Sequence, residues 1–112
     1  MDASPAAAEF EKLATALHGE GASRSEILGH PMMTLEGRMF ACLDGASLAV
    51  RLGRWTDEYE RALDVPGASI FSPGISGRTF NDWVSLPFDA VPEWRRFATS
   101  ALSHVTALPA YH

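Results

Sequence analysis

Two short glycine turns near the middle of the chain constrain its fold more than any other feature. Glu36-Gly37 and Asp44-Gly45 each interrupt runs of residues that favour strands, and two-residue turns of this kind are typical of β-hairpins. We therefore predict three antiparallel strands, at about 31–35, 38–43 and 46–52. The middle of the chain is expected to form the centre of an antiparallel sheet.

A first helix is predicted before this sheet. Ser4-Pro5 is typical of a helix start, with the serine as N-cap and the proline in the first turn. Phe10, Leu13 and Leu17 then recur on one helical face. The helix is expected to cover about 5–18.

The second half of the chain predicts elements of both kinds. Thr56 can cap a short second helix, and two more strands are expected at about 68–71 and 79–86. Pro92 starts a last helix, whose apolar stripe ends before Pro109. Helices therefore follow the central strands as well as precede them.

These elements define an α+β fold class. We predict an antiparallel sheet of about five strands, with the N-terminal and C-terminal helices packed on one face. The chain is 46% hydrophobic, which is enough to bury a core in a chain of 112 residues. Residues 1–112 are therefore expected to form a single domain.

The alternation of side chains along the strands predicts which residues the helices cover. With both turns as two-residue loops, the predicted helix-covered face carries Met32, Thr34, Met39, Ala41, Leu43, Leu48, Val50 and Leu52. The predicted second face carries Met33, Leu35, Arg38, Phe40, Cys42, Ser47, Ala49 and Arg51. This second face is too apolar for open solvent and too charged for a core.

A homodimer through the second face is therefore predicted. Its interface would have four apolar side chains at the centre, namely Met33, Leu35, Phe40 and Ala49. Arg38 and Arg51 would lie opposite each other at the rim, a like-charge pair that needs neutralising. The alternative is that a segment of the same chain, either 72–77 or 21–30, folds over this face.

The charge and the single cysteine limit the classes of function. A net charge of −5 opposes binding to a phosphate backbone, so nucleic acid is not an expected partner on its own. Cys42 has no second cysteine with which to form a disulfide or a zinc site. The sequence shows neither a signal peptide nor an apolar run long enough to span a bilayer, which predicts a cytoplasmic protein.

One loop has the composition of an anion site. Its hydroxyls, glycine and cation are Ser76, Gly77, Arg78 and Thr79. The alternative interpretation is a structural hairpin loop in which Arg78 pairs with Asp82. A phosphate loop of the nucleotide-binding type is excluded, because this stretch is too short and leads into a predicted strand rather than a helix.

Other reactive side chains are better explained by structure. Cys42 lies in a predicted central strand, where a small packing residue is expected. The histidines show no metal-ligand spacing, so neither a metal nor a cofactor is predicted; they are His18, His30, His104 and His112. Trp55, Trp83 and Trp94 suggest base stacking, which the negative charge opposes. No nucleophile pairs with a base, so no catalytic residue is assigned and an enzyme is not expected.

Four strings along the chain carry a family resemblance. They are Ile27-Leu28-Gly29-His30-Pro31, Leu35-Glu36-Gly37-Arg38-Met39-Phe40-Ala41, Val65-Pro66-Gly67 and Gly77-Arg78-Thr79-Phe80-Asn81-Asp82-Trp83-Val84. Over about 10–108 the chain resembles the N-terminal domain of the TfoX/Sxy competence-regulator family of bacteria. It departs from the family at Ile27-Leu28 and at Phe80, where hydrophobic residues replace Met-Phe and Met.

The resemblance implies a stand-alone domain without the helical C-terminal domain of the full-length regulators, and it brings no catalytic residues with it. We expect a non-enzymatic interaction or regulatory module with an unknown protein partner. One alternative is a small-molecule or anion-binding domain that uses the Ser72–Thr79 loop. The other is a DNA-associated transcriptional or competence regulator, for which a mobility shift that fades with salt would be diagnostic.

Overall fold

The structure is a computed structural model, and it describes residues 4–72 and 80–109. Within these residues, six strands form one antiparallel sheet in the order β1-β2-β3-β4-β6-β5. The strands are β1 (Ser23–Ile27), β2 (His30–Leu35), β3 (Arg38–Asp44), β4 (Ser47–Arg51), β5 (Ser69–Phe71) and β6 (Phe80–Leu86). The helices are α1 (Pro5–His18), α2 (Asp57–Leu63), the 3-10 turn η1 (Phe88–Ala90) and α3 (Val91–Ala107).

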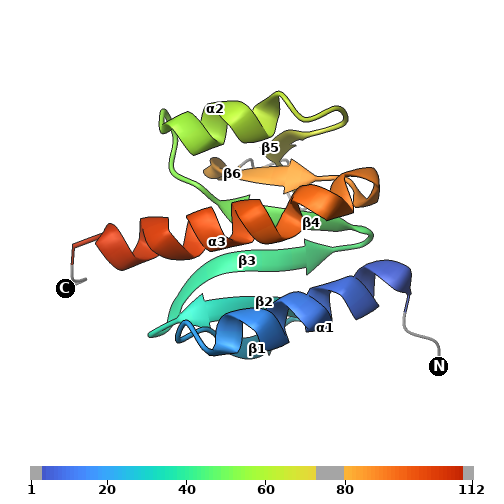
Figure 1. Cartoon of the computed structure of the whole chain (residues 1–112), viewed down its shortest axis with the longest axis vertical. Helices are drawn as coiled ribbons and strands as arrows, with labels where there is room; N and C mark the ends of the chain where they lie inside the picture. The colour runs from blue at the N-terminus through green and yellow to red at the C-terminus, as the bar shows by residue number, and fades with distance from the viewer. Residues whose placement is uncertain (1–3, 73–79, 110–112) are drawn as a thin grey trace.

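The helices lie on one side of the sheet, as the sequence predicts. Figure 1 shows α1 and α3 crossing the same face, with α2 near β6 at the opposite end of the sheet from α1. All three helices contribute side chains to one core with this face. Its largest fully buried side chains are Trp94, Phe10, Phe40, Phe97, Met33, Leu48, Leu52 and Leu86. The predicted α+β fold is therefore confirmed.

Local capping explains where two helices begin. The Ser4 hydroxyl accepts a hydrogen bond from the amide of Ala7 at 3.1 Å, and α1 starts at the next residue, Pro5. The Thr56 hydroxyl accepts from the amide of Tyr59 at 3.1 Å and caps α2 in the same way. Both caps satisfy amides that have no partner inside the helix.

A β-bulge in β3 decides which side chains the helices cover. Met33 pairs with Ala41, but its neighbour Thr34 pairs with Met39, so Phe40 is an extra residue in β3. Phe40 and Ala41 are consequently both buried in the core beneath the helices. Met39 packs against the opposite face instead.

The bulge overturns part of the predicted face assignment. Met33 and Phe40 are 0% exposed and belong to the helix-covered core, against which Leu35 also packs. The prediction that these three residues form the second face is therefore wrong. The reverse holds for Met32 and Met39, which were expected under the helices and lie on the second face. The extra residue inverts the predicted faces of the residues before it, in β2 and at the start of β3, whereas Ala41 and Leu43 after it keep the face that was predicted.

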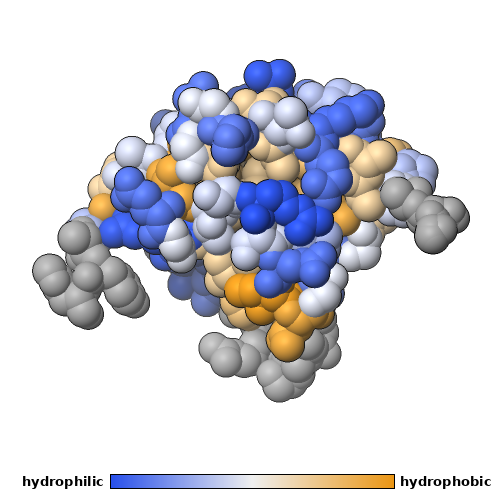
Figure 2. All heavy atoms as spheres, turned by 90° about the horizontal axis from the view of Figure 1, so that it is seen from below, coloured by the Kyte–Doolittle hydropathy of each residue, from blue (hydrophilic) through white to orange (hydrophobic). Residues whose placement is uncertain are grey.

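Strand β1 was not predicted, because four of its five residues are exposed and give no apolar pattern. It pairs with β2 and extends the sheet, so this part of 21–30 does not fold over the second face. The guanidinium of Arg24 contacts the Glu11 carboxylate at 2.6 Å and ties this edge to α1. Seen from this end, hydrophilic residues lie among neutral and hydrophobic ones, with a small hydrophobic patch low in the view (Figure 2). Charged side chains on an edge strand disfavour pairing with another chain.

Candidate functional site

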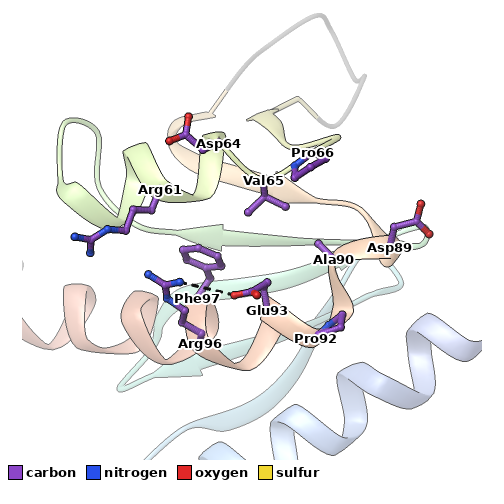
Figure 3. A pocket seen from close by; sticks show the side chains of 10 residues that line it. All are labelled: Arg61, Asp64, Val65, Pro66, Asp89, Ala90, Pro92, Glu93, Arg96 and Phe97. Atoms are coloured by element: carbon purple, nitrogen blue, oxygen red, sulfur yellow. Dashed lines mark ion pairs between the residues drawn. The ribbon is translucent and has the colours of Figure 1, made fainter.

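A cleft lies between the end of α2 and the start of α3 (Figure 3). Its volume is about 500 Å³, and it is open to solvent on one side. The lining residues are Arg61, Asp64, Val65, Pro66, Asp89, Ala90, Pro92, Glu93, Arg96 and Phe97. The cleft thus combines an apolar floor with a rim of both charge signs.

The two arginines of this cleft already have carboxylate partners. Arg61 contacts Glu58 at 2.7 Å, and Arg96 contacts Glu58 at 3.6 Å and Glu93 at 3.8 Å. The Arg96 guanidinium also lies 4.8 Å from the centre of the Phe97 ring. An anionic ligand would have to displace these contacts, so the cleft is not a preformed anion site.

The predicted anion loop cannot be compared with the structure. Ser76, Gly77, Arg78 and Thr79 lie outside the described residues. Asp82, the expected partner of Arg78, contacts the Arg51 guanidinium at 4.0 Å and accepts a hydrogen bond from the Arg54 amide at 3.3 Å. Asp82 therefore takes part in holding the segment after β4.

Arg38 has a structural role that the sequence did not reveal. Its guanidinium donates to the carbonyl oxygens of Val105, Leu108 and Pro109, at 2.9, 3.1 and 2.6 Å. These carbonyls lie at the C-terminal end of α3, where the helix has no partners for them and favours a cation. The prediction that Arg38 lies opposite Arg51 is therefore wrong, because Arg38 reaches across to α3.

The second face of the sheet carries a smaller cluster of buried side chains. Its members are Met32, Cys42, Ala49, Phe71 and Trp83, with Met39 and Phe80 packed against them. Burial, with a smaller contribution from Asp44, raises the pKa of the Cys42 thiol to about 12. The thiol is therefore protonated at neutral pH and is a packing group, as predicted. The homodimer through this face stays a prediction, with Cys42 and Ala49 on that face as expected.

His104 supports the backbone of the segment after β4. A β-carbon on Gly53 would fall on the His104 imidazole, 2.7 Å from its Nε2 atom, so the two residues are in close contact. Burial lowers the pKa of His104, and the nearby Arg51 lowers it further, while Asp82 acts in the opposite direction. Across residues 4–72 and 80–109, no group of three potential metal ligands is found.

The turn at residues 53–56 presents the most exposed aromatic ring described. Trp55 is 74% exposed and has a φ of 76°, a left-handed conformation that is unfavourable for any residue with a β-carbon. The Arg54 guanidinium lies 4.6 Å from the centre of the Trp55 ring. We refer to residues 53–56 as the tryptophan turn.

Both ends of the tryptophan turn are fixed to the fold. The amides of Leu52 and Gly53 donate to the Asp82 carbonyl at 3.0 and 3.1 Å. The Thr56 hydroxyl donates to the Leu52 and Gly53 carbonyls, each at 2.9 Å. These contacts fix the backbone on which Trp55 stands, so the ring is presented in a defined place rather than on a loose loop.

Sequence reasoning considered Trp55 only as a possible stacking residue. One sequence signal could have indicated that Trp55 is exposed. Trp55 stands directly before Thr56, the N-cap of α2, and therefore does not belong to the buried face of that helix. The positive φ and the contacts with Asp82 depend on tertiary structure and have no local sequence pattern.

Comparisons with protein-family models, with curated proteins and with solved structures found no match for this chain. Within the described ranges, no helix has both the length and the apolar character needed to cross a bilayer. The class that the structure itself defines is an α+β protein with helices packed on one side of an antiparallel sheet.

Proposed function

We propose that the chain is a non-enzymatic interaction or regulatory module that binds a protein partner through the tryptophan turn. The observation that carries this proposal is Trp55, which is 74% exposed and has a φ of 76° on an anchored backbone. A left-handed residue with a β-carbon costs about 1–2 kcal/mol. Backbone strain of this kind clusters at functional sites, as well as in tight turns such as the one at Glu36.

The identity of the exposed side chains supports a binding role. Tryptophan and arginine are enriched among the residues that contribute most to protein interfaces, and Arg54 lies directly over Trp55. Because the turn is already held in place, binding would require little further ordering of the chain. Two side chains that catalysis could use are engaged in other contacts, since Cys42 is buried and protonated and Arg96 is paired.

Comparative affinity capture tests this function. The full chain and its Trp55→Ala variant are immobilised, and each is incubated with an extract of the organism that encodes the parent protein. Lys12→Ala is the matched control, because Lys12 is also exposed and lies on α1, away from the turn. We expect the parent and Lys12→Ala to retain the same proteins and Trp55→Ala to lose them. Retention of the same proteins by folded Trp55→Ala would contradict the proposal.

The cleft between α2 and α3 favours a second candidate function, the binding of a small molecule. Its volume of about 500 Å³ and its Phe97 floor are suitable for a compact ligand. Calorimetric titration with a panel of compact uncharged metabolites tests it, because the arginines of the cleft are already paired with carboxylates. Binding that is lost in Arg96→Ala and kept in Arg95→Ala would support this function. Binding that both variants retain would place the ligand elsewhere.

A further inference from the structure

The guanidinium of Arg54 is available for a partner. It lies over the Trp55 ring at 4.6 Å. Within the described part of the chain its side chain makes neither a hydrogen bond nor an ion pair. The Asp82 carboxylate contacts the backbone amide of Arg54 and the side chain of Arg51, not the Arg54 guanidinium. A cation with free donors therefore stands at the most exposed ring of the structure.

The stacked arrangement determines which groups these donors can meet. A guanidinium is planar and carries five N–H donors in its plane. With its central carbon over the Trp55 ring, the Arg54 guanidinium still has N–H donors without a protein partner among the described residues, and two such donors match the two oxygens of a carboxylate. The part of the indole that Arg54 does not cover remains free for an apolar side chain.

We infer that the tryptophan turn binds a partner-protein segment that carries an aspartate or glutamate next to an apolar side chain. The carboxylate pairs with Arg54, and the apolar side chain packs on Trp55. This inference rests on the proposed function of the turn as a binding surface. It adds the chemistry of the partner to that function.

A shallow groove next to the turn extends the same surface. It has a volume of about 240 Å³, and Arg51, Asp82 and Trp83 are among the residues that line it. Asp82 joins the groove to the turn, because one carboxylate oxygen contacts the Arg54 amide and the other contacts Arg51. The contact with Arg51 is long, at 4.0 Å, so Arg51 offers a second cation to an extended acidic segment.

A protein segment is favoured over nucleic acid as the occupant. Tryptophan and arginine also stack on bases, but the net charge of −5 repels a phosphate backbone. Isolated carboxylates on a protein need only the local cations, Arg54 and Arg51. The net charge opposes one or two carboxylates less than it opposes a run of phosphates, so a segment with an acidic residue beside an apolar one fits this chain better than an oligonucleotide does.

Selection from a random peptide library displayed on phage tests the inference. The full chain is the target, and the Trp55→Ala variant removes peptides that bind elsewhere. We expect the remaining peptides to be rich in aspartate and glutamate beside apolar residues. Binding of the selected peptides is then measured by the fluorescence anisotropy of a dye attached to the peptide, a signal that does not depend on Trp55 and can therefore be read in every variant.

Two variants and a control give the expected pattern of affinities. Trp55→Ala should weaken binding by about thirtyfold, the usual minimum for a dominant interface residue. Arg54→Lys should weaken it by about tenfold, because a lysine cannot pair with both carboxylate oxygens in one plane. Lys12→Ala should bind like the parent. Since both substituted side chains are exposed, circular dichroism should show that each variant folds.

The outcomes separate this inference from the proposed function. The inferred acidic chemistry of the partner would be refuted by peptides that depend on Trp55 but lack acidic residues. It would also be refuted by peptides that bind Arg54→Lys as tightly as the parent. In both cases the proposed role of the tryptophan turn as a binding surface would stand. A library that yields no peptide dependent on Trp55 would overturn both. A single-stranded oligonucleotide that binds the turn more tightly than the selected peptides would also overturn the inference.

Discussion

The contact between Gly53 and His104 makes Gly53→Ala a sharp test of how the tryptophan turn is held. Gly53 has a φ of 85°, and its missing β-carbon leaves room for the His104 imidazole. An alanine would therefore be unfavourable for two separate reasons, the backbone conformation and the clash with the ring. The imidazole belongs to α3, so the clash would push the turn away from the fold.

The expected destabilisation follows from these two effects. The left-handed backbone costs an alanine about 1–2 kcal/mol. Displacing a packed ring costs about 1–3 kcal/mol. Alanine also reduces the conformational entropy of the unfolded chain, which offsets about 0.4–1 kcal/mol of this destabilisation. Gly53→Ala should therefore lower the free energy of unfolding by about 1–5 kcal/mol. A typical domain has a free energy of unfolding of only about 5–15 kcal/mol.

Urea unfolding of four variants measures the two effects separately. Gly45→Ala is the matched control, because Gly45 has a φ of 62° and nothing within 4 Å of its missing β-carbon. It should show the backbone cost alone, about 1 kcal/mol. His104→Ala removes the ring, so Gly53→Ala in that background should cost little more than Gly45→Ala.

The outcome for the double variant decides whether this reasoning holds. If Gly53→Ala were no more harmful than Gly45→Ala, the close contact with His104 would be refuted. If it were equally harmful with and without His104, the cost would come from the backbone alone.

Four further predictions concern the core, the end of α3 and two titratable groups. Truncation of Trp94 or Phe97, each 1% exposed, to alanine should cost about 3–5 kcal/mol in urea unfolding, and a variant that unfolds like the parent would contradict the packing of α3. Arg38→Ala should cost about 1–3 kcal/mol, because it leaves carbonyls at the end of α3 without their donor, and Arg38→Lys should restore only part of this. The Cys42 thiol, with a pKa raised to about 12, should resist alkylation at neutral pH until the chain unfolds, and rapid labelling of the native chain would contradict its burial. Burial lowers the pKa of His104 below its usual 6.5, so the unfolded chain binds a proton at this imidazole more readily than the folded chain does. The free energy of unfolding should therefore fall as the pH drops from 6.5 toward the folded-state pKa. His104→Gln should make this loss of stability smaller.

Elements with local signals were predictable from the sequence. Ser4 and Thr56 are N-caps whose hydrogen bonds span three residues, so both helix starts could be predicted from the residues around them. The Glu36-Gly37 turn was also predicted, and both of its residues have positive φ, as a tight hairpin requires. The second turn lies one residue later than expected, since Asp44 pairs with Ser47.

Features that depend on distant residues were not predictable. The bulge at Phe40 arises from the pairing of β3 with β2, and the alternation of apolar and polar residues in the sequence does not reveal it. Strand β1 exposes four of its five residues, so it has no apolar period to detect. The tryptophan turn depends on Asp82, which is 28 residues away from Arg54 along the chain.

Fluorine NMR of the chain labelled with 5-fluorotryptophan tests the binding role of the tryptophan turn most directly. The three tryptophans of the chain give separate reporters, of which Trp55 is exposed and Trp83 and Trp94 are buried. The Trp55 resonance is identified by its absence from Trp55→Phe. Addition of the extract that contains the partner should shift the Trp55 resonance and leave the positions of the two buried resonances unchanged. A Trp55 resonance that keeps its position while the extract shifts Trp83 or Trp94 would contradict the account.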